Sequence, residues 1–167
     1  MDLFLDYIEN GKGKWHKRAL TDRSMMYTGL REDQTNAVLA TYGDALLKFA
    51  YCEVLLDTVE ELSEEKAKYE SDISLVHIAQ HYQLLKYLDF RKNDRDIPQD
   101  YSVRKIEKDF GAKKKQRIRH FNKKRKYLAT AIEAILGAMY KDGYTFQQIV
   151  EVVRSWKSLL ERHPDFE

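Results

Sequence analysis

Residues 35–47, TNAVLATYGDALL, decide the fold prediction for this chain of 167 residues. The side chains of Leu39, Tyr42 and Leu46 recur three and four positions apart, which is the spacing of one face of an α-helix. Asp44 lies among small residues on this helix, and we expect no cation close in the sequence to pair with its carboxylate. The pattern therefore predicts a long helix, from residue 35 to about residue 59, that carries an isolated acid.

A second helix with the same arrangement is predicted over residues 127–140. Its apolar side consists of Leu128, Ala131, Ile132, Ile135, Leu136 and Met139. Glu133 lies among Thr130, Ala134 and Gly137, so each predicted helix has one acid surrounded by small side chains. Small residues allow two backbones to approach closely. We therefore predict that Asp44 and Glu133 come together and share a divalent metal ion.

Helical spacing also predicts shorter helices within residues 2–9, 15–20, 71–90 and 145–160, with the 71–90 segment divided into two. No segment keeps the strict alternation of polar and apolar residues that is typical of a strand. The predicted fold class is all-α, and residues 1–167 are expected to form a single domain.

Composition narrows the class of protein. The chain is 43% hydrophobic and 34% charged, and no apolar run approaches the roughly 20 residues needed to span a bilayer. Its single cysteine, Cys52, excludes an internal disulfide and fits a reducing compartment, so we expect a cytoplasmic protein without a membrane anchor. The sequence has no Gly-rich phosphate loop, no Cys/His zinc spacing and no exposed-serine elbow.

Charge is distributed unevenly along the chain. Residues 101–126 contain twelve Lys and Arg against two acids, a net +10, whereas the whole chain carries +2, so the remainder carries −8. Such polarity indicates a polyanionic partner on one side of an acidic body. The cations expected to make these contacts are Lys113, Lys114, Lys115, Arg117, Arg119, Lys123, Lys124, Arg125 and Lys126.

Four motifs in order resemble the ribonuclease III domain family. Residues 19–24, ALTDRS, are similar to the opening of these domains, and Gly-Asp-Ala at 43–45 falls where the family signature ends. Residues 75–79, LVHIA, resemble an intervening family helix, and residues 129–140, ATAIEAILGAMY, resemble the second acid-bearing helix. The resemblance extends over about residues 19–160.

The resemblance implies a metal-dependent endoribonuclease in which Asp44 and Glu133 bind Mg²⁺, with Mn²⁺ as a substitute. The family usually supplies four acids, but Ala40 and Thr130 stand at the other two positions. The compact Mini-III branch, which has no double-stranded RNA-binding domain, is similar in this respect. Glu53 and Asp142 are two further acids that could replace a missing ligand.

The resemblance also implies two partners. One is double-stranded or structured RNA, bound by the basic segment, and the other is a second copy of the chain, bound through the long helix at residues 37–44. Two alternatives to the nuclease remain open. The chain could be a catalytically inactive RNA-binding or structural subunit of a ribonucleoprotein, or Asp44 and Glu133 could be ordinary surface charges.

Overall fold

The computed structural model describes residues 1–91, 114–164 and 166, with only the backbone of residues 114–124. The described residues are helical apart from turns and one isolated bridge between Thr21 and Asp89, so the prediction of an all-α fold is confirmed. The elements are α1 (Leu3–Asn10), α2 (Lys14–Ala19), η1 (Arg23–Thr28), η2 (Glu32–Gln34), α3 (Ala37–Leu55), α4 (Leu62–Tyr69), α5 (Asp72–His81), η3 (Leu84–Lys86), α7 (Lys114–Lys141) and α8 (Phe146–Leu160).

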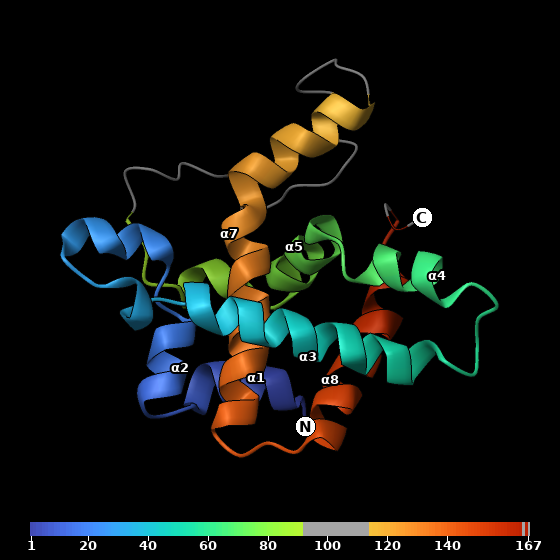
Figure 1. The fold of residues 1–167 in the computed structure, drawn as a ribbon, viewed down its shortest axis with the longest axis horizontal. Coiled ribbons are helices and arrows are strands. Elements are labelled where there is room, and N and C mark those ends of the chain that lie inside the picture. The colour runs from blue at the N-terminus through green and yellow to red at the C-terminus, as the bar shows by residue number, and fades with distance from the viewer. Residues whose placement is uncertain (92–113, 165, 167) are drawn as a thin grey trace.

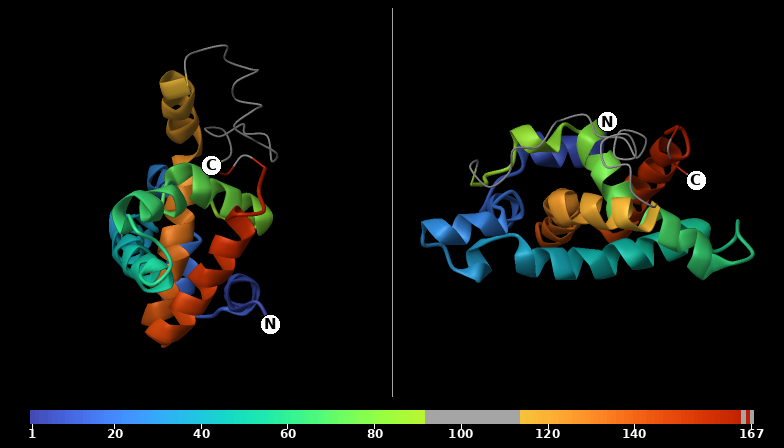
Figure 2. Two further views of the ribbon diagram at one scale, coloured as in Figure 1. Left: turned by 90° about the vertical axis from the view of Figure 1, so that its right-hand side faces the viewer. Right: turned by 90° about the horizontal axis from the view of Figure 1, so that it is seen from above.

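Helix α7 is the central element. It contacts α3, α5, α2 and α8, and its residues Ala131, Ile135 and Leu136 are fully buried. Figure 1 shows α7 crossing α3 steeply, with the N-terminal end of α7 extending beyond the rest of the helices. In the second view of Figure 2, α3 lies along one face of the molecule, on the far side of α7 from α1.

The crossing of α3 and α7 depends on two glycines. A Cβ atom at Gly43 would overlap the carbonyl oxygen of Glu133 and lie 2.6 Å from its carbonyl carbon. A Cβ at Gly137 would lie 2.7 Å from the carbonyl oxygen of Leu39. Any larger residue would push the helices apart, so the expectation that small residues let these two backbones meet is confirmed.

The opposite side of the fold is packed with large side chains. Trp156 of α8 and Phe4 of α1 are fully buried and meet edge to face, with ring centroids 4.8 Å apart. Helix α8 starts at a capping box in which Thr145 and Gln148 exchange side-chain and backbone hydrogen bonds. Within the described residues, no helix combines the length and apolar character that a bilayer span requires.

Two element boundaries differ from the predictions. Helix α3 ends at Leu55, earlier than expected, and α7 begins at Lys114, well before the predicted start at residue 127. The 71–90 segment does divide, because Gln83 adopts the left-handed conformation (φ 51°) between α5 and the 3₁₀ helix η3.

Candidate metal and RNA site

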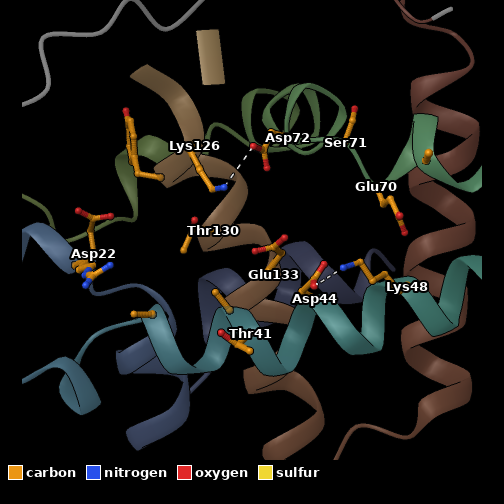
Figure 3. A pocket seen from close by; sticks show the side chains of 15 residues that line it. Asp22, Thr41, Asp44, Lys48, Glu70, Ser71, Asp72, Lys126, Thr130 and Glu133 are labelled. Atoms are coloured by element: carbon orange, nitrogen blue, oxygen red, sulfur yellow. Dashed lines mark hydrogen bonds and ion pairs between the residues drawn. The ribbon is translucent and has the colours of Figure 1, made fainter. Parts of the chain in front are cut away.

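An open pocket of about 800 Å³ lies where α3 crosses α7. Helix α3 contributes Asp44 and Lys48, and α7 contributes Glu133 and Lys126. The junction of α4 and α5 closes one side with Glu70, Ser71 and Asp72, while Asp22 and Arg23 lie at the other. Figure 3 shows the carboxylates of Asp44 and Glu133 pointing toward one another across the crossing.

Asp44 and Glu133 lie close together because α3 and α7 are in contact at this point. Gly43 precedes Asp44 in the chain and lies directly against the backbone of Glu133. The close crossing therefore places the two side chains on adjacent helix surfaces, both open to the pocket. The structure thus brings together the two acids that the sequence selected.

Burial and like charge act on Glu133. Partial burial, followed by the nearby carboxylates of Asp44 and Asp72, raises the pKa of Glu133 to about 7, and the charges of Lys126 and Lys48 oppose part of that rise. Ionisation of a carboxyl group in this position is therefore unfavourable, and a bound cation would stabilise the ionised form. Perturbed acids in clefts are typical of functional sites.

Asp44 differs from the sequence prediction in one respect. Lys48, one helical turn later, donates a hydrogen bond to Asp44 Oδ2 at 2.7 Å, so Asp44 does have a cation close in the sequence. The hydrogen bond to Asp44 raises the pKa of Lys48. The expectation of an isolated acid was wrong because residues four apart on a helix face each other, and that spacing is present in the sequence.

The positions of the two missing acids line the same pocket. Ala40 lies one turn before Asp44 and Thr130 one turn before Glu133, and both border the cavity. Asp142 is elsewhere, because it accepts a hydrogen bond from Tyr7 Oη at 2.5 Å, and Glu53 also lies outside the pocket lining. Neither of these acids lines the pocket with Asp44 and Glu133.

Asp22 and Asp72 line the pocket without having been predicted as site residues. Asp22 is 2% exposed and accepts a hydrogen bond from the backbone of Ser24, which caps η1. Asp72 is in the first turn of α5 and lies 3.8 Å from Lys126 Nζ. Both come from segments distant in sequence from Asp44 and Glu133, and no local spacing links either of them to those two acids.

The carboxylates of Asp44 and Glu133 could hold a divalent metal ion weakly. Among the described residues, no group of three or more His, Cys, Asp and Glu side chains converges closely enough to hold a metal. Asp44 and Glu133 supply carboxylate oxygens, and their mutual repulsion would be relieved by a hard dication. Mg²⁺ accepts one or two carboxylates and retains several waters, so two acids are compatible with it.

The predicted RNA-binding residues divide into three groups. Lys113 lies outside the described residues, as do the side chains of Lys114, Lys115, Arg117, Arg119, Lys123 and Lys124, whose backbone forms the start of α7. Lys126 is exposed, lines the pocket and pairs with Asp72. Arg125 is different, because it is only 2% exposed.

Arg125 is a correction to the expected contact surface. It lies three, four and seven positions before Leu128, Ala129 and Ile132, all of which are buried on the inner face of α7. Helix phase therefore turns this guanidinium inward, away from the exposed side that a long polyanion would contact. Composition gives the number of charged side chains in a segment but not which face of the helix each one occupies.

The fold and site define a class: an all-α domain with two carboxylates at a glycine-mediated helix crossing, next to the basic start of one of those helices. A search of curated protein sequences finds no match. The sequence model of the Ribonuclease III domain family matches residues 37–144, which include Asp44, Glu133 and the crossing glycines. That range is more than half of the chain, so the chain belongs to the ribonuclease III domain family, whose members are generally metal-dependent endoribonucleases.

Proposed function

We propose that this protein is a divalent-metal-dependent endoribonuclease that hydrolyses phosphodiester bonds in double-stranded or structured RNA, as a step of RNA processing. The observation that carries the proposal is the convergence of Asp44 and Glu133, from two crossing helices, on one open pocket. Family membership supports the same reaction class.

Asp44 and Glu133 would hold the ion, Mg²⁺ or Mn²⁺, with the remaining coordination left to water and RNA. When bound, such an ion supplies Lewis-acid chemistry that activates water and neutralises phosphate charge. The protein's own contribution is positional. Gly43 and Gly137 fix the helix crossing, and partial burial leaves the carboxylate of Glu133 poorly solvated beside Asp44.

RNA would follow α7 away from the pocket. Lys126 borders the cavity and the basic residues of the preceding turns continue along the same helix, which projects beyond the body in Figure 1. Duplex RNA is bound mainly through its shape and backbone, which suits a row of cations. We propose Lys113, Lys114, Lys115, Arg117, Arg119, Lys123, Lys124 and Lys126 as phosphate contacts and leave out the buried Arg125.

We also propose a homodimer formed through α3. The exposed side of this helix carries apolar or small residues at alternating spacings of four and three: Val38, Tyr42, Ala45, Phe49, Cys52 and Leu56. Val38, Phe49 and Leu56 are 53%, 56% and 61% exposed, an unusual set of large apolar side chains on one stripe. A second copy related by a two-fold axis would cover the stripe and present two sites to the two strands of a duplex.

The oligomeric state can be measured separately from activity. Phe49→Glu and Leu56→Glu place a charge on the stripe, and each is expected to shift the dimer to monomer in sedimentation velocity. Tyr27→Glu is the matched control, because Tyr27 is an exposed aromatic residue on a different element. A wild-type protein that is monomeric at working concentration would contradict the dimer.

The activity is tested on a perfect RNA duplex with Mg²⁺ or Mn²⁺. Wild type is expected to cleave, while Asp44→Asn and Glu133→Gln are each expected to lose activity by about 1,000-fold, because each removes one of only two anionic ligands. Glu151→Gln is the control, since Glu151 is an exposed acid on α8 that pairs with Arg154. Unchanged cleavage by Glu133→Gln would contradict the assignment of the site.

The alternative is an inactive RNA-binding or structural subunit of a ribonucleoprotein. It is favoured by the absence of a third acid in the cluster among the described residues. That alternative predicts RNA binding by wild type without cleavage in either metal, and RNA affinity that Glu133→Gln leaves unchanged. A single domain over residues 1–167 and a cytoplasmic location remain predictions.

A further inference from the structure

Lys48 occupies a distinctive position in the pocket. It lies on α3 one turn after Asp44, donates to Asp44 Oδ2 at 2.7 Å and borders the same cavity as Glu133 (Figure 3). Its side chain is 49% exposed. An ammonium group has three hydrogens, and Asp44 is its one hydrogen-bond acceptor among the described residues. Two donors therefore remain for a ligand in the pocket.

The small number of acids at the helix crossing suggests a function for a cationic side chain in this site. With Ala40 and Thr130 in place of acids, the helix crossing itself carries Asp44 and Glu133, while other elements bring Asp22, Glu70 and Asp72 to the pocket lining. No third donor joins them within the described part of the chain, so the donor set is adequate for one ion and poor for two. Displacement at a phosphodiester spreads negative charge over the phosphate oxygens, and two-metal enzymes neutralise it with a second ion.

We propose that Lys48 is a catalytic residue that takes the place of a second divalent ion. Without metal, its ammonium group neutralises Asp44; with RNA bound, it contacts a non-bridging oxygen of the scissile phosphodiester. The inference rests on the proposed function, because it names a further group of the same site. Lys48 keeps its proton throughout, so its role is electrostatic and requires no proton transfer.

The side chain has the properties that this exchange requires. A lysine carries a compact charge on a flexible four-carbon stem, so its ammonium group can turn from a carboxylate to a phosphate without movement of the helix. A divalent ion at Asp44 would also compete with Lys48 for the same carboxylate. Metal binding and release of Lys48 from Asp44 are then linked.

An ion pair outside the pocket provides the contrast. Lys157 and Glu161 on α8 have the same four-residue spacing and a similar distance, 2.6 Å. That pair lies outside the pocket lining, whereas Lys48 borders a cavity that contains a second carboxylate. Lys157→Met is therefore a matched control that removes the same charge and the same type of contact.

The experiment compares Lys48→Met, Lys48→Arg and Lys157→Met on two measurements, after circular dichroism has verified folding. The first is single-turnover cleavage of a duplex RNA at saturating Mg²⁺. Lys48→Met is expected to be about 100-fold slower, as for other single electrostatic contacts in active sites. Lys48→Arg should recover much of the rate because it restores the charge, and Lys157→Met should match wild type.

The second measurement is binding of Mn²⁺ to the RNA-free protein, followed by electron paramagnetic resonance. Lys48→Met is expected to bind Mn²⁺ several-fold more tightly than wild type, because the competing cation is gone. A purely structural role would give the opposite result, weaker binding through a misplaced Asp44, and would overturn the proposal.

The outcomes separate the two hypotheses. If wild type and Lys48→Met cleave RNA at similar rates while Glu133→Gln does not, the proposed nuclease stands and the role of Lys48 is wrong. If wild type cleaves no RNA with either metal, the proposed function itself fails. Slow cleavage together with tighter Mn²⁺ binding in Lys48→Met supports the proposal, since only a cation shared between Asp44 and the substrate gives both.

Discussion

The α3–α7 crossing and the α1–α8 contact are packed in opposite ways. At the crossing, two glycines bring the backbones together and leave Asp44 and Glu133 facing each other. At the other contact, Trp156 and Phe4 fill the space between helices with large aromatic rings. The first arrangement brings like charges together at the expense of stability, and the second supplies apolar burial.

This difference assigns separate roles to the two regions. Burying aromatic side chains is among the largest stabilising contributions available to a small domain. A half-buried acid beside another acid, in contrast, lowers stability whenever both are ionised. Substitutions in the α1–α8 contact should therefore change stability, whereas substitutions at the acids should change activity and stability in opposite directions.

The largest effect is expected from Trp156→Ala. The side chain is fully buried, so its removal leaves a cavity next to Phe4 and should lower the free energy of unfolding by about 4 kcal/mol. Urea denaturation measures the change. Tyr27→Ala is the control, because Tyr27 is 79% exposed and should change stability by less than about 0.5 kcal/mol. A similar loss in both variants would contradict the assignment of stability to the aromatic contact.

The next effect is expected from Gly43→Ala. Alanine is the better helix former by about 1 kcal/mol, so this change would stabilise an exposed helix. Here the added Cβ would overlap the carbonyl oxygen of Glu133, and we expect a net destabilisation of about 3 kcal/mol. Urea denaturation should show this loss, and Thr41→Ala, on the exposed face of the same helix, should not. A stabilised Gly43→Ala variant would mean that the helices do not meet at this glycine.

Much of the fold and part of the site were predictable from the sequence. Apolar spacing in α3 and α7, with small residues around Asp44 and Glu133, indicated both helices and their close crossing. These are local patterns, and helical geometry converts them directly into faces. Asp72 and Asp22 were not predictable, because only the tertiary fold brings α5 and the segment before η1 to the pocket.

Two errors have different physical causes. The pairing of Lys48 with Asp44 follows from a four-residue spacing that the sequence contains, so local helix geometry is its cause. Arg125 was assigned by charge density, although its spacing to Leu128 and Ile132 places it on the buried face. Where a basic segment continues into a buried helix, the position of each basic residue around the helix has to be considered as well as the number of charges.

The third effect concerns the acids at the α3–α7 crossing and is measured as the free energy of unfolding of Glu133→Gln. Because the folded pKa of Glu133 is about 7 and its ordinary value is 4.5, the folded chain binds this proton more tightly than the unfolded chain. The stability from this group is fully present below pH 4.5 and is lost as the pH rises through 7. Allowing for solvent screening, Glu133→Gln should be more stable than wild type by about 1–2 kcal/mol at pH 8.

Urea denaturation in EDTA from pH 5 to 8 measures this difference. The gap between Glu133→Gln and wild type should widen in favour of the variant as the pH rises, while Glu151→Gln should show no such trend. Saturating Mg²⁺ should reduce the gap at pH 8, because an ion that binds the folded wild type stabilises it. A gap independent of pH would mean that Glu133 titrates normally.

The smallest effect is expected from Thr130→Asp, which returns an acid to the pocket one turn before Glu133. Thr130 is only partly buried, so the new carboxylate can be accommodated, and added negative charge should strengthen binding of a dication. The Mg²⁺ concentration for half-maximal cleavage should fall by about threefold, or roughly 0.6 kcal/mol. Thr41→Asp adds the same charge on the α3 side of the pocket. If both variants lower the Mg²⁺ requirement equally, the effect is general attraction by the pocket; a larger effect at Thr130 would place the ion beside Glu133.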